Sequence, residues 1–213
     1  MPVISADDRQ RLARRTVNRM KSYFVLRNEQ SAPLPPDFQG EHLRFPSTLI
    51  VEFLSYFTVE GDVVFDPFAG FGTTLIAAES MERAGYGIEA NPHRFAYAQS
   101  RLQNPDRLLL GDTLKLGDYQ FPSIDFSFTS PPYMNKDDSG NPLRGETAGS
   151  YIQYLDDMKT IYTHLATRMK QGTYAVIEAA NLCREGHLTT LAWDIANVVS
   201  TVLTFEREIR LPA

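Results

Sequence analysis

The 213-residue chain is predicted to fold as an α/β protein built on a mostly parallel, doubly wound sheet. From residue 47 onward, short apolar runs typical of buried strands alternate with longer segments of helical periodicity. Such alternation requires right-handed crossovers, which place helices on both faces of a parallel sheet. A glycine-rich turn, FDPFAGFGTT at residues 65–74, follows the first of these strands, where doubly wound sheets bind ligands.

Residues 1–40 are predicted to form a basic N-terminal helix and a proline-rich linker, ahead of a domain of residues 41–213. Between residues 9 and 27 there are seven arginines and lysines and no acidic residue. Arg11, Arg15 and Arg19 recur on one face of a helix expected over residues 7–27. The segment SAPLPPDFQG at residues 31–40 contains three prolines, which indicates a loop.

The rest of the chain is assigned to helices and strands in alternation. Pro46 and Ser47, a plausible N-cap, open the first of these helices. The predicted helices cover residues 47–57, 73–84, 92–102, 151–169 and 188–199. The predicted strands cover residues 63–65, 86–89, 108–110, 124–128, 174–178 and 204–210.

The composition is that of an ordinary globular protein, with 43% hydrophobic and 22% charged residues. A net charge of −5 argues against nonspecific coating of nucleic acid, although the basic helix can still hold a phosphate backbone locally. The single cysteine, Cys183, excludes an internal disulfide, suits a reducing cytoplasm and is expected in the core. No metal site is predicted, because the four histidines lack metal-ligand spacing, and no apolar run is long enough for a membrane span.

Acidic residues end three consecutive predicted strands around the glycine-rich turn. Gly70 and Gly72 allow a sharp turn and close approach of a ligand, and free N–H groups at the following helix start can receive a carboxylate. Asp66 ends the first strand, where an acid can hold an ammonium group. Glu89 ends the second at the spacing expected for ribose hydroxyls, and Asp112 ends the third, where it can accept from an adenine amino group. Any one of these residues is equally explained by a turn or a helix cap, but together they predict a nucleoside-type cofactor.

The pentapeptide TSPPY at residues 129–133 directly follows the fourth predicted strand. Pro131 and Pro132 fix φ and lack N–H groups, so nearby carbonyls are rigid and free to accept. A rigid carbonyl and the Ser130 hydroxyl can both accept from an NH₂ group, while Tyr133 offers a face on which a base stacks, typically worth about 1–3 kcal/mol. The alternative is a proline turn with a packing tyrosine. The position of TSPPY across the sheet from the glycine-rich turn favours a binding pocket over a simple proline turn.

Taken together, FDPFAGFGTT, IEANP at residues 88–92 and TSPPY resemble the DNA amino-methyltransferases, the cytosine-N4 and adenine-N6 class. HLRFPSTLIVEF at residues 42–53 is similar to the family's segment before the glycine turn, so the resemblance extends from residue 42 to about 180. It implies a Rossmann-like S-adenosylmethionine-dependent methyltransferase fold and a site-specific DNA-methylating enzyme of the restriction–modification kind. The residues it implies for the cofactor are Phe45, Asp66, Phe68, Gly70, Gly72, Thr73, Thr74, Glu89 and Asp112. The catalytic pocket it implies is Ser130, Pro131, Pro132 and Tyr133, and the serine favours cytosine-N4 over adenine-N6.

The sequence departs from the family in two places. Only 17 polar, glycine-containing residues, 134–150, separate the tetrapeptide SPPY at residues 130–133 from the next helix. The family usually carries a recognition domain at this place. The 17 residues resemble a mobile loop. The family's C-terminal antiparallel hairpin is expected to be incomplete, because the chain stops where the first hairpin strand would end. We therefore expect a truncated form, or a partner subunit that supplies target recognition or the last strand.

Two other functions fit parts of the same pattern. An amino-methyltransferase acting on RNA or a tRNA base would use the same tetrapeptide, although such enzymes usually bring an added RNA-binding domain. A truncated non-catalytic subunit would keep the cofactor fold and act with a partner, but an intact TSPPY argues against it. The leading expectation is a cytoplasmic enzyme that methylates a base flipped out of duplex DNA, with no membrane contact.

Overall fold

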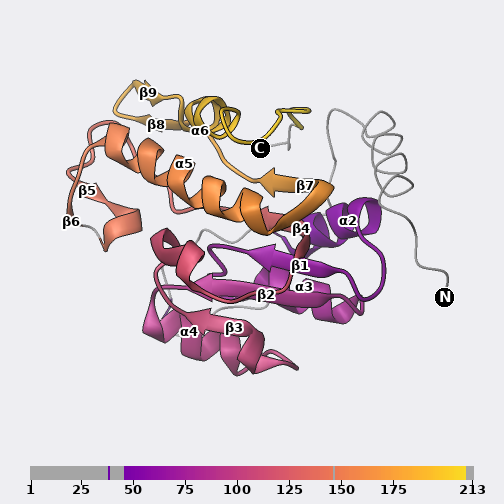
Figure 1. Cartoon of the computed structure of the whole chain (residues 1–213). Helices are drawn as coiled ribbons and strands as arrows, with labels where there is room; N and C mark the ends of the chain where they lie inside the picture. Colours follow the sequence, from indigo (N-terminus) through magenta and orange to yellow (C-terminus); the bar gives the residue numbers. More distant parts are fainter. Residues whose placement is uncertain (1–37, 39–45, 146, 210–213) are drawn as a thin grey trace.

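The computed structural model of the chain describes residues 38, 46–145 and 147–209 (Figure 1). The predicted N-terminal helix, the linker other than Phe38, and the candidate cofactor residue Phe45 lie outside the described residues.

The core of the molecule is a five-stranded, entirely parallel sheet with strand order β3-β2-β1-β4-β7 (Figure 1). Its strands are β1 (Val63–Asp66), β2 (Ala84–Glu89), β3 (Leu108–Leu110), β4 (Ile124–Thr129) and β7 (Met169–Ile177). All six residues of β4 are buried, as expected for a strand covered on both faces. The prediction of a mostly parallel, doubly wound α/β sheet is confirmed.

Helices cover both faces of this sheet, and successive residues of β1 show how. Val64 packs into a cluster with α2 and α3, whereas Phe65 packs into a cluster with α5 and α6. This alternation follows from the two-residue period of a strand. The helices are α2 (Ser47–Phe57), α3 (Thr73–Ser80), α4 (Pro92–Gln99), α5 (Tyr151–Arg168) and α6 (Leu191–Val199), with short 3-10 turns η2 (Pro105–Arg107) and η3 (Thr113–Asp118).

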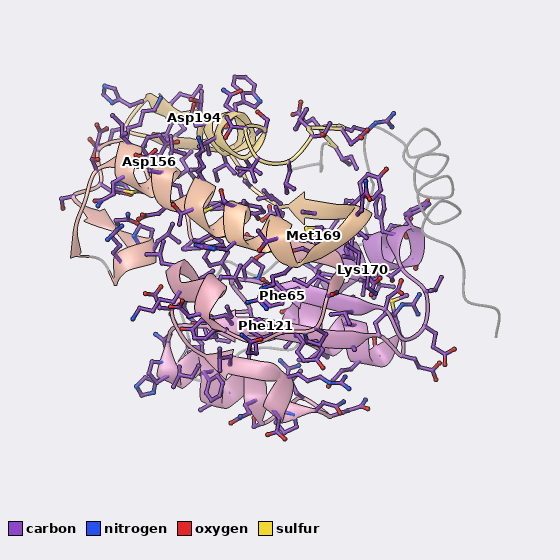
Figure 2. All side chains as sticks on the ribbon, in the orientation of Figure 1. Phe65, Phe121, Asp156, Met169, Lys170 and Asp194 are labelled. Atoms are coloured by element: carbon purple, nitrogen blue, oxygen red, sulfur yellow. The ribbon has the colours of Figure 1, made fainter. Side chains whose placement is uncertain are left out.

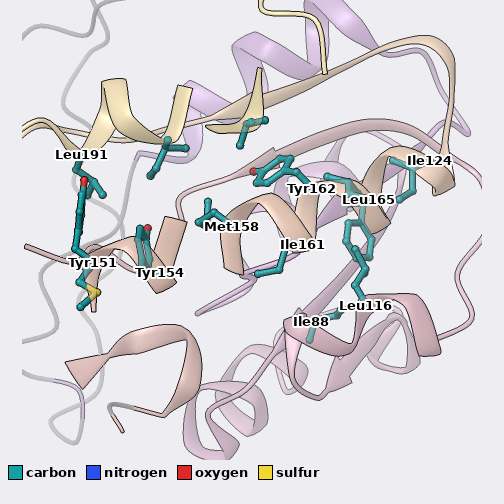
Figure 3. Packing of buried hydrophobic residues seen from close by; sticks show 14 residues of the cluster. Ile88, Leu116, Ile124, Tyr151, Tyr154, Met158, Ile161, Tyr162, Leu165 and Leu191 are labelled. Atoms are coloured by element: carbon teal, nitrogen blue, oxygen red, sulfur yellow. The ribbon is translucent and has the colours of Figure 1, made fainter. Parts of the chain in front are cut away.

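The longest helix, α5, supplies most of one core layer. Tyr154, Met158, Ile161, Tyr162 and Leu165 are fully buried and line its inner face at helical spacing (Figure 3). Within the same core cluster, the ring of Phe65 on β1 packs edge to face against that of Phe121, which precedes β4, with centroids 4.9 Å apart (both are labelled in Figure 2). This packing fixes α5 over β1 and β4, so the N-terminal end of the helix stays close to the chain that leaves β4.

The described residues differ from the predicted elements mainly at the C-terminal end. The strand predicted over residues 204–210 is wrong for residues 204–209, which form no strand. The helix predicted from residue 188 begins at Leu191, after a two-stranded antiparallel hairpin of β8 (Leu182–Arg184) and β9 (His187–Thr189). Cys183 lies on this hairpin and is exposed, so its predicted place in the core is wrong. Short apolar runs cannot by themselves separate a strand from an extended or helical segment. Among the described residues, β7 is an edge strand of the main sheet.

Segment 134–150 is not the loose loop that its polar composition suggested. Its described residues form a two-stranded hairpin, β5 (Gly140–Asn141) and β6 (Thr147–Ala148), around the 3-10 turn η4 (Pro142–Arg144). The buried carboxylate of Asp157 on α5 accepts from Asn141 Nδ2 at 2.8 Å. The same carboxylate accepts from Arg144 Nε and Nη2, each at 2.8 Å. A forked guanidinium–carboxylate pair fixes orientation as well as distance, so it pins the segment to α5.

None of the helices within the described ranges is both long and apolar enough to cross a membrane.

Candidate active site

The two sequence motifs meet at the carboxyl ends of β1 and β4. These strands are parallel neighbours, with Phe65 paired to Ser127, so the turns that follow them lie at the same edge of the sheet. Thr129 Oγ1, at the end of β4, donates to Asp66 Oδ1, at the end of β1, over 2.5 Å. Strand order reverses at this pair of strands, which is where an open α/β sheet forms a ligand-binding crevice.

The glycine-rich turn depends on two residues with positive φ. Gly70 has φ +54° and Gly72 has φ +79°, both in the left-handed region that favours glycine. Gly72 is the N-cap of α3 and contributes no side-chain cap, so the first N–H groups of the helix are not satisfied by a capping side chain. A Cβ at Gly72 would also approach Ala98 of α4 to 3.1 Å. The turn is therefore tightly packed and presents backbone N–H groups at its end.

Glu89 holds the glycine-rich turn against the end of β2. Its carboxylate accepts from Gly70 N at 2.8 Å through Oε2 and from Asn91 N at 2.7 Å through Oε1. Asn91 in turn caps α4, because its Oδ1 accepts from His93 N at 2.9 Å and Arg94 N at 3.1 Å. Glu89 is buried. Each carboxylate oxygen has more than one acceptor site, so both can also accept from a ligand hydroxyl.

Asp66 is fully buried, and hydroxyl and amide groups of the chain surround its carboxyl group. Oδ1 accepts from Phe68 N at 2.9 Å as well as from Thr129, and Oδ2 accepts from Thr74 Oγ1 at 2.6 Å. Burial raises the pKa of Asp66 to about 6, against the lowering effect of these hydrogen bonds and with a small further rise from the charge of Glu89. Asp66 thus joins the two motifs, and Thr74 contributes to that link with a hydroxyl that is fully buried.

Asp112 lies two residues after β3, the strand that neighbours β2 in the sheet. Its Oδ1 accepts from Leu114 N at 2.9 Å and so caps η3, while its own N–H donates to the Tyr119 hydroxyl at 3.0 Å. The next residue, Thr113, donates from Oγ1 to the Pro67 carbonyl at 2.7 Å. The structure therefore places the three acids after adjacent strands, in the order β3-β2-β1. The chain between β1 and α3 is hydrogen-bonded both to Glu89 at the end of β2 and to Thr113 after β3.

Two further candidate residues lie on the same turn. The Phe68 side chain is half-buried, and Thr73, the first residue of α3, is also half-buried. On the outer side of the turn, Phe71 forms an aromatic cluster with Phe38 and Tyr97. The ring centroids of Phe38 and Phe71 are 5.2 Å apart, and those of Phe71 and Tyr97 are 5.9 Å apart. This cluster supports the turn from the side away from β4.

The tetrapeptide side chains converge on a carboxylate that the sequence analysis did not single out, Glu178. Ser130 Oγ donates to Glu178 Oε2 at 2.6 Å, and the Tyr133 hydroxyl donates to the same oxygen at 3.1 Å. Burial, followed by the nearby charge of Glu178, raises the pKa of Tyr133 well above its usual value, so the phenol stays protonated. Because a carboxylate only accepts, the hydroxyl proton of Ser130 is directed at Glu178, and the serine oxygen keeps its capacity to accept.

The backbone of the tetrapeptide is fixed on both sides. Glu178 N donates to the Thr129 carbonyl at 2.8 Å, and the Tyr154 hydroxyl on α5 donates to the Pro132 carbonyl at 2.9 Å. Within the described ranges, the carbonyls of Ser130 and Pro131 have no hydrogen-bond partner. The Pro132 carbonyl is thus already engaged, while acceptance of an amino group by the other two carbonyls stays a prediction.

Glu178 directly follows β7, just as Asp66 and Glu89 end β1 and β2 and Asp112 follows β3 by two residues. The same signal, an acid at the carboxyl end of a predicted strand, was present in the sequence at residues 174–178. A search that extended this rule to every strand of the sheet would have included it. Its role depends on the placement of β7 beside β4, which sequence spacing does not give.

A family described as DNA methylase, of the N6 and N4 type, accounts for part of this chain. Residues 7–100 match its model. Type II methyltransferase M.Cfr9I of Citrobacter freundii is 40% identical over 70 residues, or 32% of this chain and 23% of the relative. Type II methyltransferase M.XycI of Xanthomonas campestris pv. cyanopsidis is 40% identical over 67 residues, or 31% and 22%. The resemblance to the DNA amino-methyltransferases is confirmed, and the matched stretch spans less than a quarter of the length of each relative.

Solved structures with a similar chain course include two methyltransferases. One is a TehB-like SAM-dependent methyltransferase from Corynebacterium glutamicum, with 14% identity, a TM-score of 0.49, and coverage of 78% of this chain and 77% of that one. Another is precorrin-6y C5,15-methyltransferase from Geobacter metallireducens, with 14% identity, a TM-score of 0.47, and coverage of 71% and 66%.

Proposed function

We propose that this chain is an S-adenosylmethionine-dependent methyltransferase that modifies the exocyclic amino group of a DNA base, cytosine N4 in preference to adenine N6. The observation that carries the proposal is the Ser130–Glu178–Tyr133 cluster, set one strand away from the glycine-rich turn and joined to it by the Thr129–Asp66 hydrogen bond. The family match and the relatives named as type II methyltransferases support DNA as the substrate.

The residues around the turn suit a nucleoside cofactor that carries an amino acid. The start of α3 has no side-chain cap, so its free N–H groups and the positive end of the helix dipole can receive a carboxylate. Glu89 has acceptor sites for ribose hydroxyls, and Asp112 has a second carboxylate oxygen for an adenine amino group. Asp66 acts mainly through the chain, because its buried oxygens bind Thr74, Thr129 and Phe68 N. When bound, S-adenosylmethionine would supply the electrophilic methyl group.

The tetrapeptide would orient the amino group of the target base. The Ser130 oxygen accepts one N–H, since its own proton points at Glu178, and the Pro131 carbonyl is available for the other. With both N–H bonds directed away, the nitrogen lone pair faces the cofactor side of the crevice. With the cofactor bound, this nitrogen would gain the methyl group, the sulfur would keep the electron pair of the broken methyl–sulfur bond, and the proton lost by the nitrogen would pass to solvent. Glu178 lies directly behind Ser130, where its negative charge stabilises the positive charge that develops on that nitrogen.

The base must leave its duplex to reach this cluster. Ser130 and Tyr133 are only partly exposed, so a stacked and paired amino group cannot approach them. The face of Tyr133 would stack on the flipped base, typically worth about 1–3 kcal/mol. A base mismatched at the target position should therefore bind at least as well as a paired one, because less pairing energy is lost.

We further propose that residues 41–213 form the catalytic domain and that residues 1–40 supply a basic arm. The arginines at 11, 15 and 19 suit contacts with phosphates, which would be independent of sequence and sensitive to salt. The whole activity, the recognition sequence and the contribution of a partner subunit belong to this proposal, since the match covers a small part of each relative.

The experiment is to supply S-adenosylmethionine labelled in the methyl group and offer unmethylated plasmid DNA, total RNA and protein in parallel. We expect label in DNA, recovered as N4-methylcytosine after digestion to nucleosides. Ser130→Ala should abolish most of it, whereas Glu60→Ala, an exposed residue in the loop before β1, should not. N6-methyladenine would correct the base, label in RNA would favour the RNA reading, and no label from any acceptor would favour a non-catalytic subunit.

A further inference from the structure

The β8–β9 hairpin lies next to the catalytic cluster and has no packing role of its own at its tip. Only residues 179–181 separate Glu178 from the start of β8. Every residue from Cys183 to Leu188 is exposed, and Leu188 keeps 59% of its surface exposed. Buried apolar side chains therefore do not explain why this part of the chain forms a hairpin.

The hairpin is nevertheless firmly built. Cys183 pairs with Leu188 and Arg184 pairs with His187, which leaves a two-residue turn. Both turn residues have positive φ, +51° at Glu185 and +80° at Gly186, as in the type I′ turns that match the twist of a β-hairpin. The turn fixes the register of the two strands, while Leu182 at the base of the hairpin packs against the core cluster beneath α5.

Segment 134–150 clasps the hairpin from the other side. Arg184 Nη1 lies 2.6 Å from Asp138 Oδ1, and Lys136 N donates to Thr189 Oγ1 at 3.2 Å. Asn181 Oδ1 accepts from Ala192 N at 3.1 Å and fixes the other end to α6. The segment that follows Tyr133 and the hairpin that follows Glu178 are therefore in contact at the same end of the molecule (Figure 1). Together, segment 134–150 and the β8–β9 hairpin are called the wall.

We propose that the β8–β9 hairpin enters the groove of duplex DNA beside the flipped base and reads its neighbours. The inference rests on the proposed function, since a base that reaches Ser130 comes from a duplex lying against this wall. A two-stranded ribbon fits the major groove. The exposed side chains match base-edge chemistry, with Arg184 for guanine, Glu185 for a cytosine amino group and Leu188 for a thymine methyl.

The chain carries a built-in probe for this contact, because its single cysteine, Cys183, is exposed on the hairpin. The rate of Cys183 alkylation by iodoacetamide would be measured on the full chain, with and without sheared unmethylated plasmid duplex. At a duplex concentration about ten times its Kd, we expect alkylation to slow roughly tenfold. As a matched control, a Cys183→Ala chain that also carries Lys159→Cys places the thiol on the exposed outer side of α5, where the rate should not change.

Alkylation at an unchanged rate under saturating duplex overturns the hairpin proposal, as does equal protection by heparin, which carries charge without base edges. Because alkylation needs no catalysis, the outcomes separate the two proposals. Protection without methylation supports the hairpin contact and overturns the proposed function. Methylation without protection supports the proposed function and overturns the hairpin contact.

A second measurement tests reading rather than proximity. In the methylation assay, Arg184→Ala should broaden the set of methylated sequences and raise the KM for DNA about tenfold or more, as loss of one base contact does. Asp138→Ala removes the ion pair with segment 134–150 but keeps the arginine. An effect seen in Arg184→Ala and not in Asp138→Ala therefore comes from the loss of a DNA contact. An unchanged sequence preference in Arg184→Ala, Glu185→Ala and His187→Ala together would overturn the reading role.

Discussion

Ser130 Oγ and Glu178 Oε2 lie 2.6 Å apart across the ends of β4 and β7, and this contact decides which way the serine hydroxyl points. Because the serine hydroxyl donates its proton to Glu178, its oxygen can only accept from a further group. The proposed chemistry needs an acceptor for an amino group at that position. A serine without such a partner would be free to rotate and to present its proton to the base instead.

Replacing Glu178 should therefore slow the reaction more than it weakens binding. Glu178→Gln removes the charge but keeps the size, and hydrogen bonds to charged groups are worth about 1.5–3 kcal/mol, so we expect kcat to fall roughly tenfold to a hundredfold. The affinity for S-adenosylmethionine should change little. Tyr133→Phe removes the other hydrogen bond to the same oxygen and keeps the ring, so its effect should be smaller. Full kcat in Glu178→Gln, combined with an inactive Ser130→Ala, would remove Glu178 from the mechanism.

Replacing Glu89 should weaken cofactor binding. Glu89→Ala removes the acceptor for Gly70 N and, in the proposed site, the acceptor for ribose hydroxyls. By the same scale for charged hydrogen bonds, the Kd for S-adenosylmethionine should rise roughly tenfold to a hundredfold in calorimetry. Glu89→Gln keeps one acceptor oxygen, so its Kd should lie between those of the native chain and of Glu89→Ala. Glu60→Ala is the control. An unchanged Kd in Glu89→Ala would mean that the cofactor binds elsewhere.

Asp66 should make the stability of the protein depend on pH. Its folded pKa, raised to about 6, lies above the usual value of 3.8, so the folded state holds the proton more tightly than the unfolded state. The stability it contributes is present at about pH 4 and is lost as the pH rises through 6; a shift of this size corresponds to roughly 3 kcal/mol. Asp66→Asn should thus gain stability relative to the native chain between pH 4.5 and 7.5 in urea unfolding. Asp156→Asn, at an exposed residue, should follow the native chain. A difference that stays constant with pH would show that Asp66 is ionised throughout.

The sequence predicted the parts of the site that depend on local chain direction. The glycine-rich turn, the three acids and the tetrapeptide each follow a strand, and strand ends in a parallel sheet meet at one edge. The start of the helix predicted at Pro92 is likewise confirmed, whereas Ser47 is not the N-cap that was predicted: it is the first residue of α2, and the N-cap is Pro46. These features need only the local pattern and the rule that orders parallel strands.

What the sequence did not predict depends on contacts between distant segments. Glu178 becomes important only because β7 pairs with β4, and the hydroxyl partners of Asp66 come from both sides of the strand reversal. The hairpin at 182–189 has exposed residues on both faces, so it lacks the alternation of buried and exposed residues that marks a strand. Polar composition suggested a loose segment at 134–150, but one buried carboxylate on α5, Asp157, provides its anchor.

That anchor leads to the last prediction, which concerns the order of segment 134–150. Arg144→Ala removes both arms of the fork on Asp157 and leaves a carboxylate that is only 5% exposed with Asn141 as its remaining donor in the described network. An underpaired buried carboxylate is costly, so the segment should open more often. We expect hydrogen exchange of the 134–150 peptides to become faster, with little change in the β1 and β4 peptides.

Arg144→Lys, which keeps the charge but not the forked hydrogen bonds, should restore only part of the protection. Lys159→Ala, on the same helix as Asp157 and exposed, is the control. Since the segment clasps the β8–β9 hairpin, exchange at residues 182–189 should rise together with it. Unchanged exchange in both segments would show that the fork is not what holds this wall together.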